Sequence, residues 1–248
     1  MTNTGSVQHQ GAATLFPTTS KADPFNIVTM AATPDAAGYY LVGAGGNVYN
    51  YGDAKFYGSK AHAKLKSPVV AMSVTSDGAG YYLVTARGNL YNFGDAKFHG
   101  SPVHVALTSP VVAMAITPDG AGYWLATASG TVFAYGDAHT YGSVSVNVKS
   151  HPVVAIASSV DGLGYDLVTS KGNVLNEGDA KFFGSLAGRK HLPAPVVAFV
   201  TTSSGGGYYL VTAKGNIYNE GAAPFYGSSA RTKLDGSVTG FAGYLPTS

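Results

Sequence analysis

The 248-residue sequence contains no cysteine, which excludes disulfide scaffolds, cysteine-ligated zinc, iron–sulfur clusters and thiol catalysis. Charged residues are scarce, at 11% of the chain against about 25% in a typical soluble protein. No apolar run reaches the roughly 18 residues of a transmembrane helix, because glycine, aspartate or asparagine interrupts every hydrophobic stretch. Residues 1–25 carry no basic stretch followed by an apolar core, so we expect no secretory signal there and no insertion into a membrane.

Glycine and aromatic residues are abundant instead. The chain has 33 glycines, 17 tyrosines and 11 phenylalanines. The glycine content is about twice the usual ~7%, and together with so many rings it argues against both disorder and a coiled coil. A chain of this length buries about 70% of its unfolded surface. We therefore expect a packed core that needs no cross-links.

An internal repeat is the strongest feature of the sequence. Aligning the chain on its Pro-Val-Val-Ala segments gives five units, spaced 42 or 43 residues apart, that occupy residues 26–236. The units begin at Asn26, Pro68, Pro110, Pro152 and Pro195. A period of about 40 residues is typical of solenoids and propellers.

Each unit has the pattern of a four-stranded meander. In the third unit, short apolar runs at 111–117, 122–128, 131–135 and 138–142 are separated by turn residues such as 118–120, Pro-Asp-Gly. The second run is apolar at nearly every position, whereas a sheet with one wet face would alternate. Both faces of each sheet must therefore be covered.

These features predict an all-β fold, a five-bladed β-propeller built from five ~42-residue four-stranded repeats at 26–236. A β-solenoid is the main alternative, but its coils rarely need three tight hairpins in each repeat. Residues 237–243 repeat the first-strand pattern once more, and residues 13–18 weakly resemble a fourth strand. We expect segments 1–25 and 237–248 to close the ring, with Phe241 and Tyr244 packing against the first blade or near Leu15 and Phe16. The alternative is that both segments are relics of a longer array of repeats.

The repeats also resemble a known family. The phrases TPDGAGYWLATASGTVFAYGDAHTYGS (117–143) and SDGAGYYLVTARGNLYNFGDAKFHGS (76–101) are similar to tandem repeats of many actinobacterial surface and secreted proteins. Such repeats often lie beside cell-wall hydrolase modules. The resemblance covers about 210 residues. It implies a protein in an extracellular or cell-envelope location, and it implies no particular biochemical activity.

The sequence offers little for catalysis. Its seven histidines form no metal-binding motif, and it has no nucleophile elbow, P-loop or dinucleotide fingerprint. We therefore expect no enzyme activity, no metal and no cofactor. The recurring aspartates precede glycine or alanine in turns, where this residue usually caps its own backbone. They are Asp35, Asp77, Asp119 and Asp161 in one turn, and Asp53, Asp95, Asp137 and Asp179 in another.

One acid departs from the repeat. A tyrosine holds the same place in all five units, which predicts a packing role between blades; the set is Tyr39, Tyr81, Tyr123, Tyr165 and Tyr208. The next place holds Tyr40, Tyr82, Trp124, Asp166 and Tyr209. We expect Asp166 either at the edge of a central channel or beside a basic residue.

The predicted ligand-binding residues lie near the ends of the blades. The turns between the second and third strands hold asparagines and bases, while aromatic residues precede the crossover loops and favour pockets between blades. The predicted site comprises Asn47, Asn89, Asn173, Asn216, Arg87, Lys171, Lys214, Tyr57, His99, Tyr141 and Tyr226. These residue types suit sugars, so we expect a multivalent, lectin-like module for cell-wall or cell-surface glycans.

The alternative is a scaffold for protein interaction or self-association. In the predicted propeller, the loops that connect one blade to the next lie on one face of the disc. Topology assigns eleven lysines and arginines to that face, and it assigns the turn aspartates with Glu177 and Glu220 to the opposite face. Such faces would stack head to tail, and the contact would weaken with salt. The bases are spread over separate loops without interleaved aromatics, which argues against nucleic acid.

Overall fold

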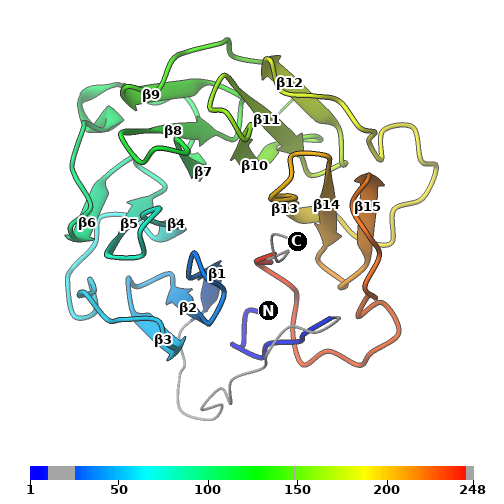
Figure 1. Ribbon diagram of the computed structural model, residues 1–248, viewed down its shortest axis with the longest axis horizontal. Helices are drawn as coiled ribbons and strands as arrows, with labels where there is room; N and C mark the ends of the chain where they lie inside the picture. The colour runs from blue at the N-terminus through cyan, green and yellow to red at the C-terminus, as the bar shows by residue number, and fades with distance from the viewer. Residues whose placement is uncertain (11–25, 148, 244–248) are drawn as a thin grey trace.

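The computed structural model describes residues 1–10, 26–147 and 149–243. Five antiparallel sheets of three strands follow one another around a central axis (Figure 1). The strands are β1 (Ile27–Ala32), β2 (Gly38–Gly43) and β3 (Val48–Gly52); β4 (Val69–Val74), β5 (Gly80–Thr85) and β6 (Leu90–Gly94); β7 (Val111–Ile116), β8 (Gly122–Thr127) and β9 (Val132–Gly136); β10 (Val153–Ser158), β11 (Gly164–Thr169) and β12 (Val174–Gly178); β13 (Val196–Thr201), β14 (Gly207–Thr212) and β15 (Ile217–Gly221). One short 3₁₀ turn, η1 (Pro102–His104), lies between the second and third sheets.

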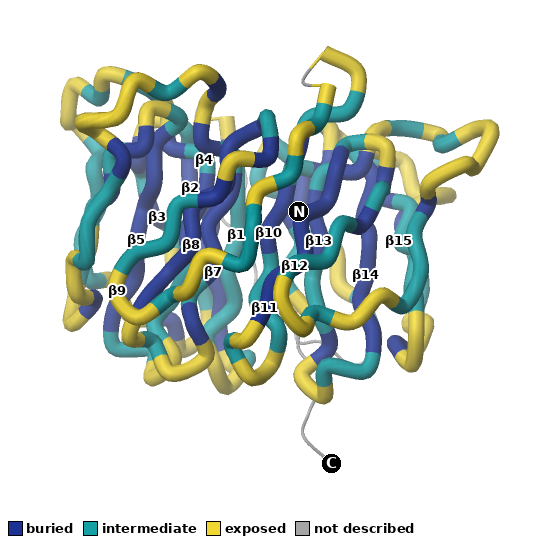
Figure 2. The backbone as a smooth tube through the Cα atoms, turned by 90° about the horizontal axis from the view of Figure 1, so that it is seen from above, coloured by how far each residue is buried: buried dark blue, intermediate teal, exposed yellow. Residues whose placement is uncertain are grey.

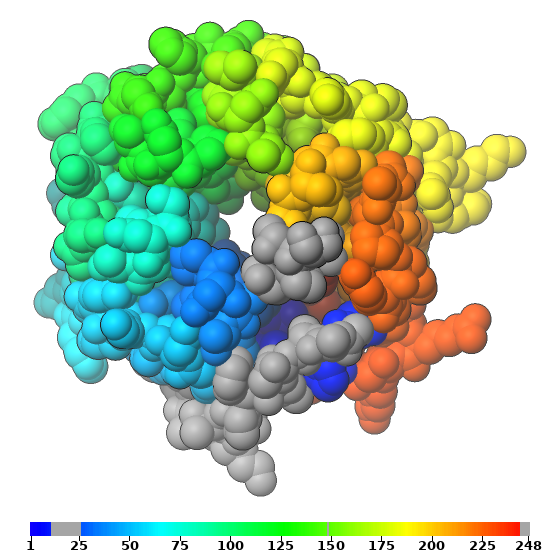
Figure 3. All heavy atoms as spheres, viewed as in Figure 1, coloured from blue at the N-terminus to red at the C-terminus, as the bar shows by residue number. Residues whose placement is uncertain are grey.

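Each sheet is a meander whose middle strand pairs with both neighbours. The first strands β1, β4, β7, β10 and β13 lie nearest the axis and pack against one another in that order (Figure 1). The space-filling view shows an opening at the centre of this arrangement (Figure 3).

The core lies on both sides of the middle strands. Every residue of β2, β5, β8, β11 and β14 is buried. Figure 2 shows buried backbone along the strands and exposed loops at their two ends. The expectation that both faces of each sheet are covered is thus confirmed.

The expected fourth strand is wrong for all five sheets, which have three strands each. In the first unit, the backbone N–H of Tyr57 donates to the Tyr81 hydroxyl of the next sheet at 3.2 Å, and that hydroxyl donates to the Gly58 carbonyl at 2.5 Å. The Tyr40 hydroxyl also donates to the Lys55 carbonyl at 2.8 Å. Tyrosine hydroxyls thus satisfy backbone groups of residues 55–58. Because of these bonds, the segment crosses to the next sheet without pairing as a fourth strand.

The packing role predicted for the repeated tyrosine is confirmed. All five members are buried. In four units the hydroxyl donates to a glycine carbonyl of the preceding unit, which ties neighbouring sheets together. The acceptors of Tyr81, Tyr123, Tyr165 and Tyr208 are Gly58, Gly100, Gly142 and Gly184.

The two ends of the described chain meet between the fifth and first sheets. Thr2 and Val238 form an antiparallel bridge, and the Asn3 N–H donates to the Ser237 carbonyl at 2.8 Å. Phe241 packs beside Tyr209, with ring centroids 6.1 Å apart. The contacts expected of Leu15, Phe16 and Tyr244 lie outside the described residues.

Candidate functional site

Asp166 in β11 occupies a place that a large ring fills in the other four units. Those rings are buried, and each donates a hydrogen bond to the backbone carbonyl 15 residues further along the chain, at 2.7–2.8 Å. The pairs are Tyr40 with Lys55, Tyr82 with Lys97, Trp124 with His139, and Tyr209 with Pro224. The aspartate side chain is too short to make this bond or to fill the space of a ring.

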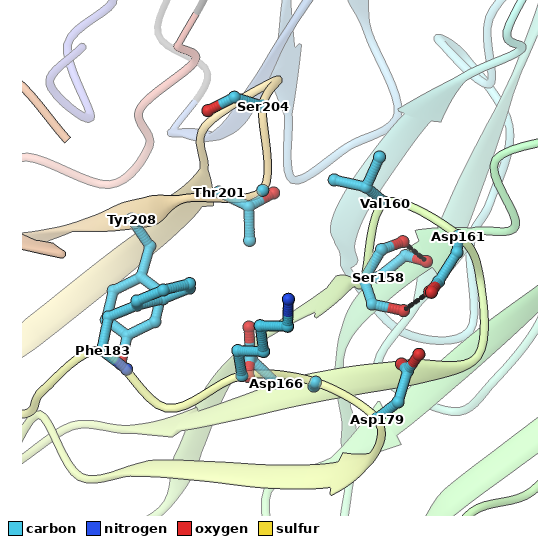
Figure 4. A pocket seen from close by; sticks show the side chains of 14 residues that line it. Ser158, Val160, Asp161, Asp166, Asp179, Phe183, Thr201, Ser204 and Tyr208 are labelled. Carbon is cyan, nitrogen blue, oxygen red and sulfur yellow. Dashed lines mark hydrogen bonds between the residues drawn. The ribbon is translucent and has the colours of Figure 1, made fainter. Parts of the chain in front are cut away.

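A cavity of about 240 Å³ opens at this place, between the fourth and fifth sheets. Figure 4 shows Asp166 between the rings of Phe183 and Tyr208 on one side and the carboxyl groups of Asp161 and Asp179 on the other. The two rings meet edge to face, with centroids 5.6 Å apart. Thr201, Ser204 and Lys181 also line the cavity.

The carboxyl group of Asp166 is almost fully buried, with 4% of the residue exposed. Its Oδ1 accepts a hydrogen bond from the Nδ2 of Asn176 on β12. Burial raises the pKa of Asp166 to about 7, because desolvation penalises the charged form more than the amide stabilises it. Asp166 therefore has neither of the expected settings, a channel edge or a basic partner: its partner is a neutral amide.

Asn176 is diverted from the role that its counterparts play. Asn50, Asn92 and Asn219 each donate to a backbone carbonyl four residues further along the chain, at 2.7–2.8 Å. Asn176 donates to Asp166 instead. The fourth unit therefore differs from the first, second and fifth units in the hydrogen bonds of two facing side chains.

The mouth of the cavity carries two further carboxyl groups. Hydrogen bonds from the Ser159 hydroxyl and the Leu163 N–H lower the pKa of Asp161. Desolvation, and then the hydrogen bond and charge of the adjoining Asp161 carboxyl group, raise the pKa of Asp179. The Leu163 bond is the turn cap that the sequence predicts, and Asp35, Asp77 and Asp119 cap their turns in the same way.

The arrangement suits a small ligand that has hydroxyl groups along one side and an apolar face on the other. A carboxyl with a pKa near 7 accepts hydrogen bonds when ionised and donates one when protonated. The rings of Phe183 and Tyr208 offer apolar surface within the same cavity. Within the described residues, no cluster of three or more histidine, aspartate or glutamate side chains is placed to bind a metal.

The asparagines and bases predicted to bind a ligand lie in the turns after the middle strands. The N–H groups of Asn89, Asn173 and Asn216 donate to threonine hydroxyls within the same turns, at 3.1–3.2 Å. Asn47 occupies the corresponding turn, and Arg87, Lys171 and Lys214 are exposed there. None of these residues lines the Asp166 cavity.

The predicted aromatic residues lie between the sheets. The hydroxyls of Tyr57 and Tyr141 donate to the carbonyls of Gly78 and Gly162, at 3.0 and 3.2 Å, and the His99 ring lies against Tyr123. These three residues fill space between neighbouring sheets. Tyr226 differs, because it is 51% exposed and lines a second, larger cavity.

The separation of charge into two faces is incomplete. Arg189 lies 4.0 Å from Glu220, so one ion pair joins residues that the sequence places on opposite faces. In the described parts of the chain, no helix has the length and apolar character needed to cross a membrane.

Comparison with known proteins gives no family for this chain: no protein-family model matches it, and no curated protein matches it.

Repeat comparison singles out Asp166, but it does not reveal Asn176 or the walls of the cavity. Phe183 follows β12, and Tyr208 belongs to the next unit. Both hold positions that are aromatic in neighbouring units, so nothing in their own pattern marks them. The sequence marks the site only through its single acid, Asp166. The residues around that acid are found only from the three-dimensional structure.

Proposed function

We propose that the protein is a non-catalytic, lectin-like binding module with the architecture of a five-bladed β-propeller whose blades have three strands. The circular order of the five sheets supports this architecture (Figure 1). The ligand we propose is a carbohydrate of the cell wall or cell surface. The resemblance to repeats of envelope proteins favours an extracellular or envelope location.

The observation that carries the proposal is the exchange of a buried ring for Asp166. In the other four units, Tyr40, Tyr82, Trp124 and Tyr209 are buried at this position. Burying a carboxyl without an opposite charge destabilises the fold, and the cavity leaves apolar and polar walls without packed partners. A ligand that fills the cavity and hydrogen-bonds the carboxyl offsets both costs. The geometry thus favours one specialised sugar subsite over five equivalent ones.

Replacing Asp166 with tyrosine tests the proposal. Asp166→Tyr restores the ring of the repeat, whose hydroxyl then reaches the Lys181 carbonyl as Tyr40 reaches Lys55. We expect glycan affinity to fall at least tenfold, because the ring fills the cavity. Binding is first sought on an array of cell-wall and cell-surface glycans and then measured by calorimetry.

Asp119→Asn is the matched control, since it alters an exposed turn aspartate outside the cavity and leaves affinity unchanged. Equal affinity in Asp166→Tyr and the unaltered protein would place the glycan elsewhere. Absence of binding at millimolar glycan would remove the lectin-like function altogether.

Clustered carboxylates favour the alternative of a self-assembling scaffold. Two aspartates from different turns meet in each of four units, and desolvation, then the hydrogen bond and charge of the first, raise the pKa of the second. The pairs are Asp35 with Asp53, Asp77 with Asp95, Asp119 with Asp137, and Asp161 with Asp179. A stacking contact made by these charges is screened by salt.

Sedimentation at 10 mM and 150 mM salt tests the stacking. A scaffold is expected to associate at low salt and to dissociate at physiological salt. The triple variant Asp53→Asn, Asp95→Asn, Asp137→Asn weakens the low-salt association, because it removes charge from one face alone. A monomer at both salt concentrations contradicts the scaffold.

A further inference from the structure

The two ends of the described chain reproduce parts of a sixth unit. The bridge between Thr2 and Val238 matches the pairing of Val69 with Thr85 at the start of the second sheet. The Val238 N–H donates to the Ala213 carbonyl at 2.9 Å, as the Val69 N–H donates to the Ala44 carbonyl. Val238 therefore stands at the start of a first strand.

The N-terminal residues take the place of the turn that joins the second and third strands of a unit. The Ile27 N–H donates to the Asn3 carbonyl at 3.0 Å, in the way that Val69 bonds Ala44. Gly5 has a φ of 90°, and its N–H donates to the Thr2 carbonyl; its counterpart Gly46 has a φ of 86° and bonds Gly43. By this correspondence Met1 stands where Val84 stands in the second unit.

One piece of the sixth unit is supplied by no described residue. The counterparts of Gly80–Leu83, which read Gly-Tyr-Tyr-Leu in the second unit, belong to the middle strand, the most buried part of every sheet. Residues 7–10 and 241–243, which hold the flanking positions, form no strand within the described chain. Two runs of backbone are thus placed on either side of a missing strand.

A cavity of about 600 Å³ lies at this place. Its walls include Met30 and Tyr39 of the first sheet, and Val200, Tyr209 and Val211 of the fifth. They also include Phe241 and Tyr226. These walls are mostly apolar and come from the two sheets that would enclose a sixth middle strand.

For two tyrosines in this cavity, no described residue supplies the ring that packs against their counterparts. Tyr40 and Tyr82 lie 5.2 and 5.3 Å from the first tyrosine of the following middle strand. Among the described residues, the ring beside Tyr209 is Phe241, at 6.1 Å. Tyr226 is 51% exposed, whereas its counterparts pack against that same tyrosine at 5.6–6.0 Å; they are Tyr57, His99, Tyr141 and Phe183.

We propose that this cavity binds an extended peptide segment of a partner chain with the pattern Gly-aromatic-aromatic-Leu, which adds as the missing middle strand. The partner's backbone pairs with residues 7–10 and 241–243, as in other cases of strand addition. Successive side chains of a strand point to opposite faces. The first ring therefore packs on Tyr209 and Tyr226, and the second on Tyr39. Glycine is required at the first position, because a Cβ on Gly80 meets the Phe93 carbonyl at 2.5 Å.

The test supplies the missing strand to the full chain. Capped Gly-Tyr-Tyr-Leu, the sequence of residues 80–83, is titrated into the protein, with Tyr-Gly-Leu-Tyr as the scrambled control. A second form carries Gly-Tyr-Tyr-Leu fused after Ser248, which raises the effective concentration, with Gly-Ser-Ser-Gly as its control. We expect the fused strand to raise the melting temperature by roughly 5 °C over its control, since ligands of the native state stabilise it.

Tyr226→Ala separates specific strand addition from nonspecific hydrophobic association. Tyr226 is exposed, so its loss leaves the sheets intact. The variant is expected to lose most of the gain from the fused strand. Equal melting temperatures for the two fusions, or an equal gain in Tyr226→Ala, would overturn the proposal. Dimerisation of the unaltered chain through this cavity, detected by sedimentation and abolished by Tyr226→Ala, would also overturn it in favour of a second copy.

Discussion

Asp166→Asn is expected to be more stable than the unaltered protein by up to about 4 kcal/mol at pH 8, with little difference below pH 4. The cause is the buried carboxyl, whose pKa is raised to about 7 from an ordinary value of 3.8. Between those values the folded protein keeps a proton that the unfolded chain has lost. The contribution of Asp166 to stability is therefore present in full below pH 3.8 and disappears as the pH rises through 7.

Asparagine keeps the shape of the side chain and the acceptor for Asn176 but carries no charge to desolvate. Denaturant unfolding of both proteins from pH 3.5 to pH 9 checks the expectation. The difference in unfolding free energy between the two proteins grows across pH 4 to 7 and then levels off. A constant difference over that range would mean that the carboxyl is solvated in the folded protein.

Deleting residues 237–248 is expected to lower the melting temperature by about 10 °C or to cause association. The deletion removes buried Val238 and the ring contact of Phe241 with Tyr209. Full burial of such a side chain contributes about 1.5–3 kcal/mol, and half-buried Phe241 contributes less than this. A loss of 1 kcal/mol shifts the melting temperature of a chain of this size by about 2–4 °C. Calorimetry and sedimentation measure the two outcomes.

Association is the second expected outcome because the deletion uncovers backbone at Ala213 and Asn3, which bond Val238 and Ser237. Unpaired strand edges recruit other chains. Point variants separate the contributions: Val238→Ser is expected to destabilise by about 2 kcal/mol, as a buried apolar residue, and exposed Ser237→Ala by less than about 0.5 kcal/mol. A truncated chain that melts like the full chain and stays monomeric would show that the segment closes nothing.

The repeat spacing predicts the number of sheets and three strands of each unit, because turn residues bound each apolar run. It fails at the fourth strand. Residues 138–142 are short and bounded by turn residues, as a strand is, yet the tyrosine hydroxyls that bond such segments come from a different part of the unit and from the next sheet. A pattern read along one unit contains no information on those partners.

The candidate site was likewise predictable from the sequence only in part. Comparison of the repeats reveals Asp166 as an exception, but an acid within an apolar strand is compatible with several surroundings. Its cavity depends on Phe183, Tyr208 and Thr201, which the sequence places in two different units. The turn asparagines stay a prediction, because an asparagine on a turn gives the same sequence pattern whether its side chain binds a ligand or its backbone only completes the turn.

The carboxyl carbon of Asp166, followed by carbon-13 NMR against pH without and with a bound saccharide, tests the proposed site most directly. We predict a midpoint near pH 7 in the free protein, a signal that Asp166→Asn lacks, and a displaced midpoint once the saccharide fills the cavity. A midpoint near pH 4, or a saccharide that binds without moving the Asp166 signal, would contradict a ligand site between the fourth and fifth sheets.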